Sequence, residues 1–292
     1  MNPADSSQTP GPPHGLSPAP PLAPARACAA SGRGLARPLA LALLGALALL
    51  AVLGPWLSGH DPRVQQLDAV RALPSAAHWL GTDHLGRDQF TRLALALRLS
   101  LGLALATVAM AALAGSALGL AAAWRGGWPD RLATTLADAV QALPGLLLVL
   151  LVAAISPGDF GPLYAGLALA LWVEFFRVVR LMGRGVLQGA PVEAARLLGF
   201  GPLAIVRRHL WPELAPVLLT LAAFGAAAAV LALATLGFVG VGLQPPTAEL
   251  GLMLIELLPY WREAPWLLLP PVSALVLLTA GFMLLARRGH AP

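Results

Sequence analysis

Residues 191–212 read PVEAARLLGFGPLAIVRRHLWP, a polar and basic stretch in a chain that is otherwise mostly apolar. Pro191 suits the first position of a helix, where its missing N–H is no loss. Glu193 follows in the first turn, where its charge complements the helix dipole. Gly199 can take the left-handed conformation that ends a helix, and Pro202 can begin the next one. The stretch therefore predicts two short helices around a glycine turn.

The rest of the chain has the composition of a membrane protein. Of its 292 residues, 58% are hydrophobic and 11% are charged, whereas a soluble domain carries about 25% charged residues. The apolar residues occur in runs of roughly 20, which is long enough for a helix to span a bilayer. The composition predicts an all-α, multi-pass membrane protein and excludes a soluble globular domain.

Six apolar runs are predicted to be transmembrane helices. They are Leu39–Leu57, Leu99–Trp124, Leu132–Ile155, Leu163–Met182, Ala215–Leu243 and Trp266–Ala286. We expect Pro144 in the third run to mark a kink rather than an end, because neighbouring helices can satisfy the freed backbone groups. An even number of spans places both termini on the same side of the membrane.

The chain divides into four parts. Residues 1–34 include eight prolines and are expected to form a disordered cytoplasmic tail. Residues 35–57 form the first transmembrane helix, and residues 58–97 form an extracytoplasmic loop. Residues 98–288 form a core of five transmembrane helices, with a cytoplasmic loop at 189–212.

Arginine supplies the positive charge, since all 19 basic residues are arginines. Thirteen lie on the face that holds both termini and the 183–212 region, and six lie on the other face. Because cytoplasmic loops carry the excess of basic residues, the richer face and both termini are predicted to be cytoplasmic. The arginines are spread over loops, which predicts membrane lipid and not nucleic acid as their counter-charge.

The absence of lysine has a chemical consequence. A phosphate-binding P-loop uses a lysine to reach the terminal phosphates, so this chain has no standard P-loop and any ATP hydrolysis needs another polypeptide. The second to sixth predicted spans contain no histidine or cysteine, which argues against an intramembrane enzyme. We therefore predict no catalytic residue, no cofactor and no bound metal.

Residues 78–88 read HWLGTDHLGRD and precede the second predicted span. Asp83, His84 and Asp88 are side chains that can bind metals, but their spacing defines no coordination geometry. Asp83 and Asp88 each precede an arginine by four residues, an order that supports an exposed helix. The pattern favours a structural helix at the membrane interface over a metal site.

The 191–212 stretch resembles the cytoplasmic loop of the permease subunits of ABC importers. The resemblance rests on Glu-Ala-Ala at residues 193–195, on Gly199, and on an apolar helix that Pro212 ends. The family has Leu-Pro at that end, whereas Trp211 precedes the proline here. Judged by its spacing alone, the stretch suits a surface helical hairpin between two membrane spans equally well.

Two further motifs resemble the dipeptide, oligopeptide and nickel branch of that family. The first matches a Leu-Gly-Thr-Asp-x-Leu-Gly-Arg-Asp signature through Gly81, Thr82, Asp83, Gly86, Arg87 and Asp88. The second, residues 236–246, is similar to the family's exit from its fifth span, where small residues let helices approach. Three motifs in the family's order, within residues 37–288, favour the permease over the surface hairpin.

The resemblance implies a type I ABC importer permease with six transmembrane helices, of the second or C-type subunit. It implies a heterodimer with a homologous permease, two ATP-binding subunits inside, and an extracytoplasmic solute-binding protein, all at a bacterial inner membrane. The solutes of this branch are peptides and related small molecules, nickel chelates included. The residues implied to couple the permease to the ATPases are Glu193, Ala194, Ala195, Gly199, Ile205 and Pro212. An ion-driven secondary transporter is the alternative, but the chain shows no inverted repeat of the kind such transporters carry.

Three polar residues lie inside predicted spans. Glu174 is near the middle of the fourth span, where insertion of a charge costs about 2.5–3.5 kcal/mol, and Asp138 and Gln141 lie in the third. They are candidates for lining the solute pathway. The alternative, which we favour for Glu174, is an internal ion pair with Arg177 one turn later, and Asp138 is close enough to the cytoplasmic end to be interfacial.

Overall fold

Helices make up the secondary structure of residues 36–155 and 159–287, which a computed structural model describes; no strand occurs among them. The predicted all-α class is confirmed. These residues belong to one compact unit. The predicted disordered tail, residues 1–34, lies outside the described residues.

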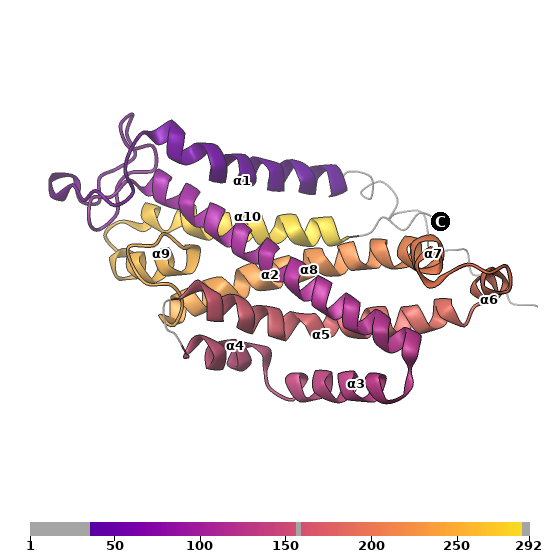
Figure 1. Cartoon of the computed structure of the whole chain (residues 1–292). Coiled ribbons are helices and arrows are strands. Elements are labelled where there is room, and N and C mark those ends of the chain that lie inside the picture. Colours follow the sequence, from indigo (N-terminus) through magenta and orange to yellow (C-terminus); the bar gives the residue numbers. More distant parts are fainter. Residues whose placement is uncertain (1–35, 156–158, 288–292) are drawn as a thin grey trace, which may run out of the picture. The chain divides into compact units, whose positions relative to one another are not determined.

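Five long helices form the body of this unit. They are α1 (Ala36–Ser58), α2 (Gln89–Arg125), α5 (Phe160–Leu187), α8 (Trp211–Val239) and α10 (Leu269–Ala286). The shorter helices are α3 (Gly127–Gln141), α4 (Gly145–Ala153), α6 (Ala190–Leu197), α7 (Pro202–Ile205) and α9 (Leu250–Leu257). Helix α2 is the centre of the packing, since it contacts α1, α5 and α8 and crosses the last two obliquely (Figure 1).

The short helices mark the two ends of the long ones. Figure 1 shows α6 and α7 together at one end, which we call the α6–α7 end. At the other end, the α9 end, α9 lies beside the segment that joins α1 to α2. This segment, residues 59–88, contains one 3₁₀ turn, Leu67–Ala69, and is otherwise irregular.

Glycines set the distance between α2 and α5. A Cβ atom on Gly115 would lie 2.3 Å from the backbone oxygen of Trp172, and one on Gly119 would lie 2.7 Å from that of Phe176. Small residues that let backbones approach this closely are typical of helix contacts in membranes. The side chains of Phe175 and Phe176 are fully buried beside this crossing, so α2 and α5 pack tightly against each other.

Length and hydropathy single out the helices that suit a bilayer. Among the described residues, four helical stretches are long and apolar enough to cross a membrane: Ala36–Ser58, Gln89–Arg125, Pro202–Val239 and Pro265–Ala286. The pair α3 and α4 would make a fifth span if it crosses as one broken element. Helix α5 has 28 residues but is not among the four. The multi-pass character is thus confirmed, and the count of six spans stays a prediction.

The second span begins ten residues earlier than expected, at Gln89 and not at Leu99. Asp88 is the residue that starts it, because its carboxylate accepts a hydrogen bond from the backbone N–H of Thr91 at 2.8 Å. A side chain that satisfies a free N–H of the first turn fixes where a helix starts. Residues 89–97, assigned from the sequence to the extracytoplasmic loop, are therefore helical.

The third span is not the single kinked helix expected over 132–155. Helix α3 ends at Gln141, α4 begins at Gly145, and the two axes differ by 85°. Pro144 directly precedes α4 with φ −54° and ψ 127°, an extended conformation. Its missing N–H and its ring prevent continuation of the preceding helix, so here the proline ends a helix.

At Pro212 the sequence predicts an interruption of the helix, and this prediction is wrong because the helix continues through the residue. The chain runs from Pro202 to Val239 as one helical stretch of 38 residues. It contains a π-helical turn at Val206–Leu210, where the N–H of Trp211 donates to the carbonyl of Val206. This wider turn accommodates the proline that follows, because a π-bulge relieves the conflict between a proline ring and the preceding turn.

Candidate functional site

The 189–212 segment forms the predicted pair of short helices at the α6–α7 end. Pro191 lies in the first turn of α6, and Glu193 follows it there. Gly199 has φ +80°, so the prediction of a left-handed glycine is confirmed. Its N–H donates to the carbonyl of Arg196, and the N–H of Phe200 donates to that of Ala195, both at 3.0 Å. These two bonds are the Schellman motif that closes a helix C-terminus.

One side of the segment anchors it to the long helices. Val192, Ala195, Ile205 and Leu210 are buried. Val192, Ile205 and Leu210 pack in one apolar cluster that also contains Val179 and Leu187 of α5 and Leu214 of α8. A movement of this segment is therefore coupled by direct packing to α5 and α8.

The other side of the segment is open. Glu193 and Ala194 are exposed, and the large apolar side chains of Leu197, Leu198 and Leu203 are 85%, 78% and 81% exposed. Apolar side chains gathered at one exposed site mark a surface for a protein partner or a membrane. Of the residues predicted to couple, Glu193, Ala194 and Gly199 are on this open surface, Ala195 and Ile205 anchor it, and Pro212 is the second residue of α8.

The α9 end holds the 81–88 signature in a buried loop, so the exposed interfacial helix expected there is wrong. Gly81 and Gly86 have φ +78° and +74°, and a Cβ atom on either would lie about 2 Å from a backbone oxygen, of Ala72 and Gln66 respectively. The hydroxyl of Thr82 donates to the carbonyl of Ala69 and accepts from the N–H of Ala72. The glycines and the threonine thus fold residues 66–72 tightly onto the loop.

Asp83 and Arg87 of the signature belong to a network of four charged side chains. Arg87 binds Asp83 through Nε at 2.6 Å and Glu256 through Nη2 at 3.2 Å. Arg92 of α2 binds Glu256 and lies 3.5 Å from Asp83. Asp83, Arg87 and Arg92 are buried. The two positive and two negative charges of this network cancel. Its ion pairs join the 81–88 loop, α2 and α9. The sequence paired Arg92 with Asp88 and did not single out Glu256; the one signal for Glu256 is that it is a lone charge in an apolar stretch.

His84 lies at the edge of this network. Its ring stacks on Tyr260 with centroids 5.3 Å apart. Burial lowers the pKa of His84, against the opposing effect of the nearby carboxylates. His84 therefore adds ring packing to the α9 end.

The exit from the fifth predicted span packs closely onto α9. Glu249 caps α9 by accepting a hydrogen bond from the N–H of Leu252 at 2.8 Å. Gly237 faces this carboxylate, so a Cβ atom there would be 2.2 Å from Oε2 of Glu249, and one on Gly251 would be 2.0 Å from the oxygen of Ala234. The prediction that small residues of 236–246 allow close approach is confirmed at Gly237. Burial raises the pKa of Glu249, and its backbone hydrogen bonds oppose this shift.

Glu174 of α5 and Asp138 and Gln141 of α3 are all exposed. Arg177 binds Asp138 at 2.7 Å, so the expected pair of Arg177 with Glu174 is wrong. A second link that the sequence did not reveal lies nearby, because Asp130 at the start of α3 binds Arg180 and Arg184 of α5. Both links join α3 to α5, and a pathway-lining role stays a prediction.

Two clefts flank α2. The cleft at the α9 end has a volume of about 630 Å³, and its lining includes Arg63, Arg98, Tyr164 and Thr247. The cleft at the α6–α7 end has about 550 Å³ and lies between Trp124 and Arg125 of α2 and the start of α7.

Comparison with known proteins gives a consistent result. The model of a family described as "Binding-protein-dependent transport system inner membrane component" matches residues 115–290. The probable D,D-dipeptide transport system permease protein DdpC of Escherichia coli K12 is 34% identical over 237 residues, which are 81% of this chain and 79% of that protein. The nickel transport system permease protein NikC of the same strain is 33% identical, over 86% and 92%. The glutathione transport system permease protein GsiD of Pectobacterium atrosepticum is 33% identical, over 75% and 72%.

Proposed function

Because the chain belongs to the family of binding-protein-dependent transport system inner membrane components, we propose that it forms half of the pathway of a peptide importer. The family consists of the membrane permeases of ABC importers, which work with ATPase and substrate-binding partners. The chain is accordingly a transport subunit and not an enzyme, and separate subunits hydrolyse the ATP. The ion-driven alternative does not fit this family.

The observation that carries the coupling role is the two-sided 189–212 segment. Its buried side packs on α5 and α8, and its open side presents Glu193, Ala194 and three exposed leucines. A docked ATPase would cover the open side and pull on the buried side. Closure of the ATPases on ATP would then reach the membrane helices through α5 and α8.

Exposed polar side chains on α3 and α5 support the presence of a second, homologous permease. Glu174 lies within the apolar part of α5 and is exposed on this subunit. A charge that faces lipid costs about 2.5–3.5 kcal/mol on insertion scales, whereas a charge that faces a water-filled path or a polar partner avoids this cost. The sister permease would cover the α3–α5 face in a heterodimer, with Glu174, Asp138 and Gln141 near the shared pathway.

The class of solute is proposed from the names of the relatives. Their names assign D,D-dipeptides, nickel and glutathione to different members. Peptides or related small solutes, nickel chelates included, are the class that this chain would carry into a bacterial cell. A soluble binding protein on the outer face would select the solute and deliver it.

Reconstitution tests the proposal. The purified chain alone should not hydrolyse ATP, and proteoliposomes that also hold the sister permease, the ATPases and the binding protein should take up peptide only with ATP inside. Omission of this chain is the control. ATP-independent, ion-gradient-driven uptake by the chain alone would overturn the proposal.

Membrane orientation gives a separate prediction. In a Cys28→Ser background, Ser75→Cys should react with an impermeant thiol reagent added outside intact cells, and Gly201→Cys should react only after lysis. Both positions are exposed, and the reason for the expectation is the thirteen-to-six arginine asymmetry. Labelling of position 201 from outside, with position 75 protected, would reverse the orientation and exclude docking to cytoplasmic ATPases.

A further inference from the structure

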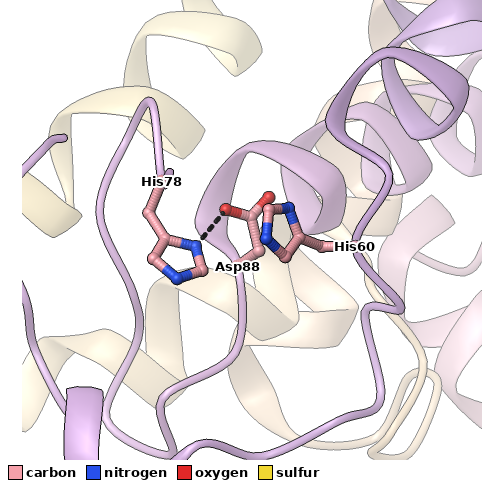
Figure 2. A group of neighbouring side chains, drawn as sticks. All are labelled: His60, His78 and Asp88. Atoms are coloured by element: carbon pink, nitrogen blue, oxygen red, sulfur yellow. Dashed lines mark hydrogen bonds and ion pairs between the residues drawn. The ribbon is translucent and has the colours of Figure 1, made fainter. Parts of the chain in front are cut away.

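Three side chains of metal-binding type meet at the α9 end, outside the charged network of Asp83 and Glu256. His60 follows α1, His78 lies in the 59–88 segment, and Asp88 precedes α2. One nitrogen or oxygen from each lies within 4.8 Å of the others. Figure 2 shows the carboxylate of Asp88 beside both rings, with the Nδ1 of His78 3.0 Å from Oδ1 of Asp88.

The imidazole of His60 is incompletely satisfied by its surroundings. Its Nδ1 is buried, with no hydrogen-bond partner among the described residues, and its ring lies 4.8 Å from that of His78. A buried imidazole nitrogen without a partner is costly, because its desolvation is not compensated. A bound cation would satisfy this nitrogen.

Hydrogen bonds from Thr91 fix the orientation of the Asp88 carboxylate. Oδ2 of Asp88 accepts from the N–H of Thr91 at 2.8 Å and from its hydroxyl at 2.6 Å. Oδ1 is thereby left facing Nδ1 of His78. Groups that orient a ligand in this way are a regular part of metal sites and affect affinity about 10–100-fold.

Space for further ligands adjoins the cluster. A cavity of about 190 Å³ is lined by residues that include Ser58, His60, Trp79 and Asp88, which is room for the water molecules that complete a coordination shell. Ligand atoms of a tetrahedral zinc site lie roughly 3.3–3.4 Å apart. The most separated ligand atoms therefore need to approach by up to about 1.4 Å, which rotation of the His60 and His78 side chains can supply.

We infer that His60, His78 and Asp88 bind a divalent transition-metal ion of the Zn²⁺, Ni²⁺ and Co²⁺ class. Two imidazoles and one carboxylate suit these ions and disfavour Mg²⁺ and Ca²⁺, which take oxygen ligands. The bound ion ties the end of α1 to the start of α2. The inference does not depend on the proposed solute or on the coupling segment, which lies at the opposite end of the long helices.

Metal binding by the full chain is the direct test. The chain, purified in detergent through a tag without histidine and stripped with a chelator, is titrated with Co²⁺ and followed by its visible absorption and by elemental analysis. We expect one ion per chain that His60→Phe removes or weakens by at least about 10-fold, because phenylalanine keeps the ring contact but offers no ligand. Zn²⁺ should displace the Co²⁺, and a large excess of Mg²⁺ should not.

Two further variants guard against misfolding and background binding. Thr91→Val should weaken Co²⁺ binding about 10-fold through the orientation of Asp88, although it leaves all three ligands in place. His84→Gln removes a neighbouring histidine outside the cluster and should leave binding unchanged. Equal Co²⁺ affinity and stoichiometry in the unaltered chain, His60→Phe and Thr91→Val would overturn the inference, as would an equal loss in His84→Gln.

Discussion

Gly199→Val should abolish ATP-driven uptake by the assembled importer while the subunit still inserts into the membrane. The reason is backbone conformation, because Gly199 has φ +80° and no atom lies within 4 Å of a Cβ placed there. A β-branched residue in this conformation costs about 1–2 kcal/mol locally. The chain would relieve that cost by changing the turn, and α7 would leave α6 in a different direction. Uptake and co-purification of the ATPase measure the two consequences.

Glu193→Arg should share this phenotype through a different cause. Glu193 is exposed in the first turn of α6, so its replacement leaves the apolar anchor intact. It reverses the charge on the open surface that we propose meets the ATPase. We expect loss of ATPase attachment, or ATP hydrolysis without transport, at normal membrane levels of the subunit.

A matched control lies two residues from Gly199. Gly201 is exposed, has φ −72° and ψ 165°, and would likewise place a Cβ atom in open space, with no neighbour within 4 Å. Valine adopts this extended conformation without strain, and it is the conformation preferred before a proline. Gly201→Val should therefore retain assembly and uptake. If Gly199→Val behaves like Gly201→Val, the 189–212 segment is a surface hairpin and not a coupling element.

This turn could be predicted from the sequence because its determinants are local. A proline and a glutamate at a helix start and a glycine at its end act on the backbone within one or two turns. The Schellman bonds of Gly199 and Phe200 join residues only three and five positions apart. Local chemistry of this kind does not depend on how the rest of the chain packs.

The network at the α9 end could not be predicted in the same way. The four-residue spacing predicts that Arg92 pairs with Asp88, but Arg92 binds Glu256, which is 164 residues away. Asp88 instead caps α2 and binds His78. Spacing along one helix proposes partners only within that helix, whereas buried charges take the partner that tertiary packing brings closest.

The two prolines show a related limit. The sequence predicts a kink at Pro144, which ends a helix, and an interruption at Pro212, which does not end one. Proline removes one hydrogen-bond donor and adds a bulky ring wherever it occurs. Whether the helix resumes depends on the turn before it, and the π turn at Val206–Leu210 has no equivalent before Pro144 in the described residues.

Arg92→Met should destabilise the folded subunit more than any single change at an exposed ion pair. Arg92 is 1% exposed and binds Glu256. Its loss leaves Asp83 and Glu256 to share the single guanidinium of Arg87. Removal of one partner from a buried ion pair costs about 3–5 kcal/mol, because an uncompensated charge stays buried. Unfolding of the purified subunit in detergent measures the loss.

The control is a solvent-exposed ion pair at the same α9 end. Arg71 binds Glu263, and their side chains are 36% and 66% exposed. Exposed pairs contribute about 0–1 kcal/mol, so Glu263→Gln should change the free energy of unfolding by no more than that. An equal effect of Arg92→Met and Glu263→Gln would show that burial of the network contributes nothing.

The double variant separates a lost attraction from an unpaired charge. Arg92→Met together with Glu256→Met removes one charge of each sign and leaves the Arg87–Asp83 pair balanced. We expect it to be more stable than Arg92→Met alone, because replacing a whole buried pair with apolar side chains is often neutral. Strictly additive losses would contradict this, since residues in one network should be coupled by about 0.5–3 kcal/mol. If the double variant is the more stable one, the buried charges specify how the 81–88 loop, α2 and α9 meet, and apolar packing supplies most of the stability.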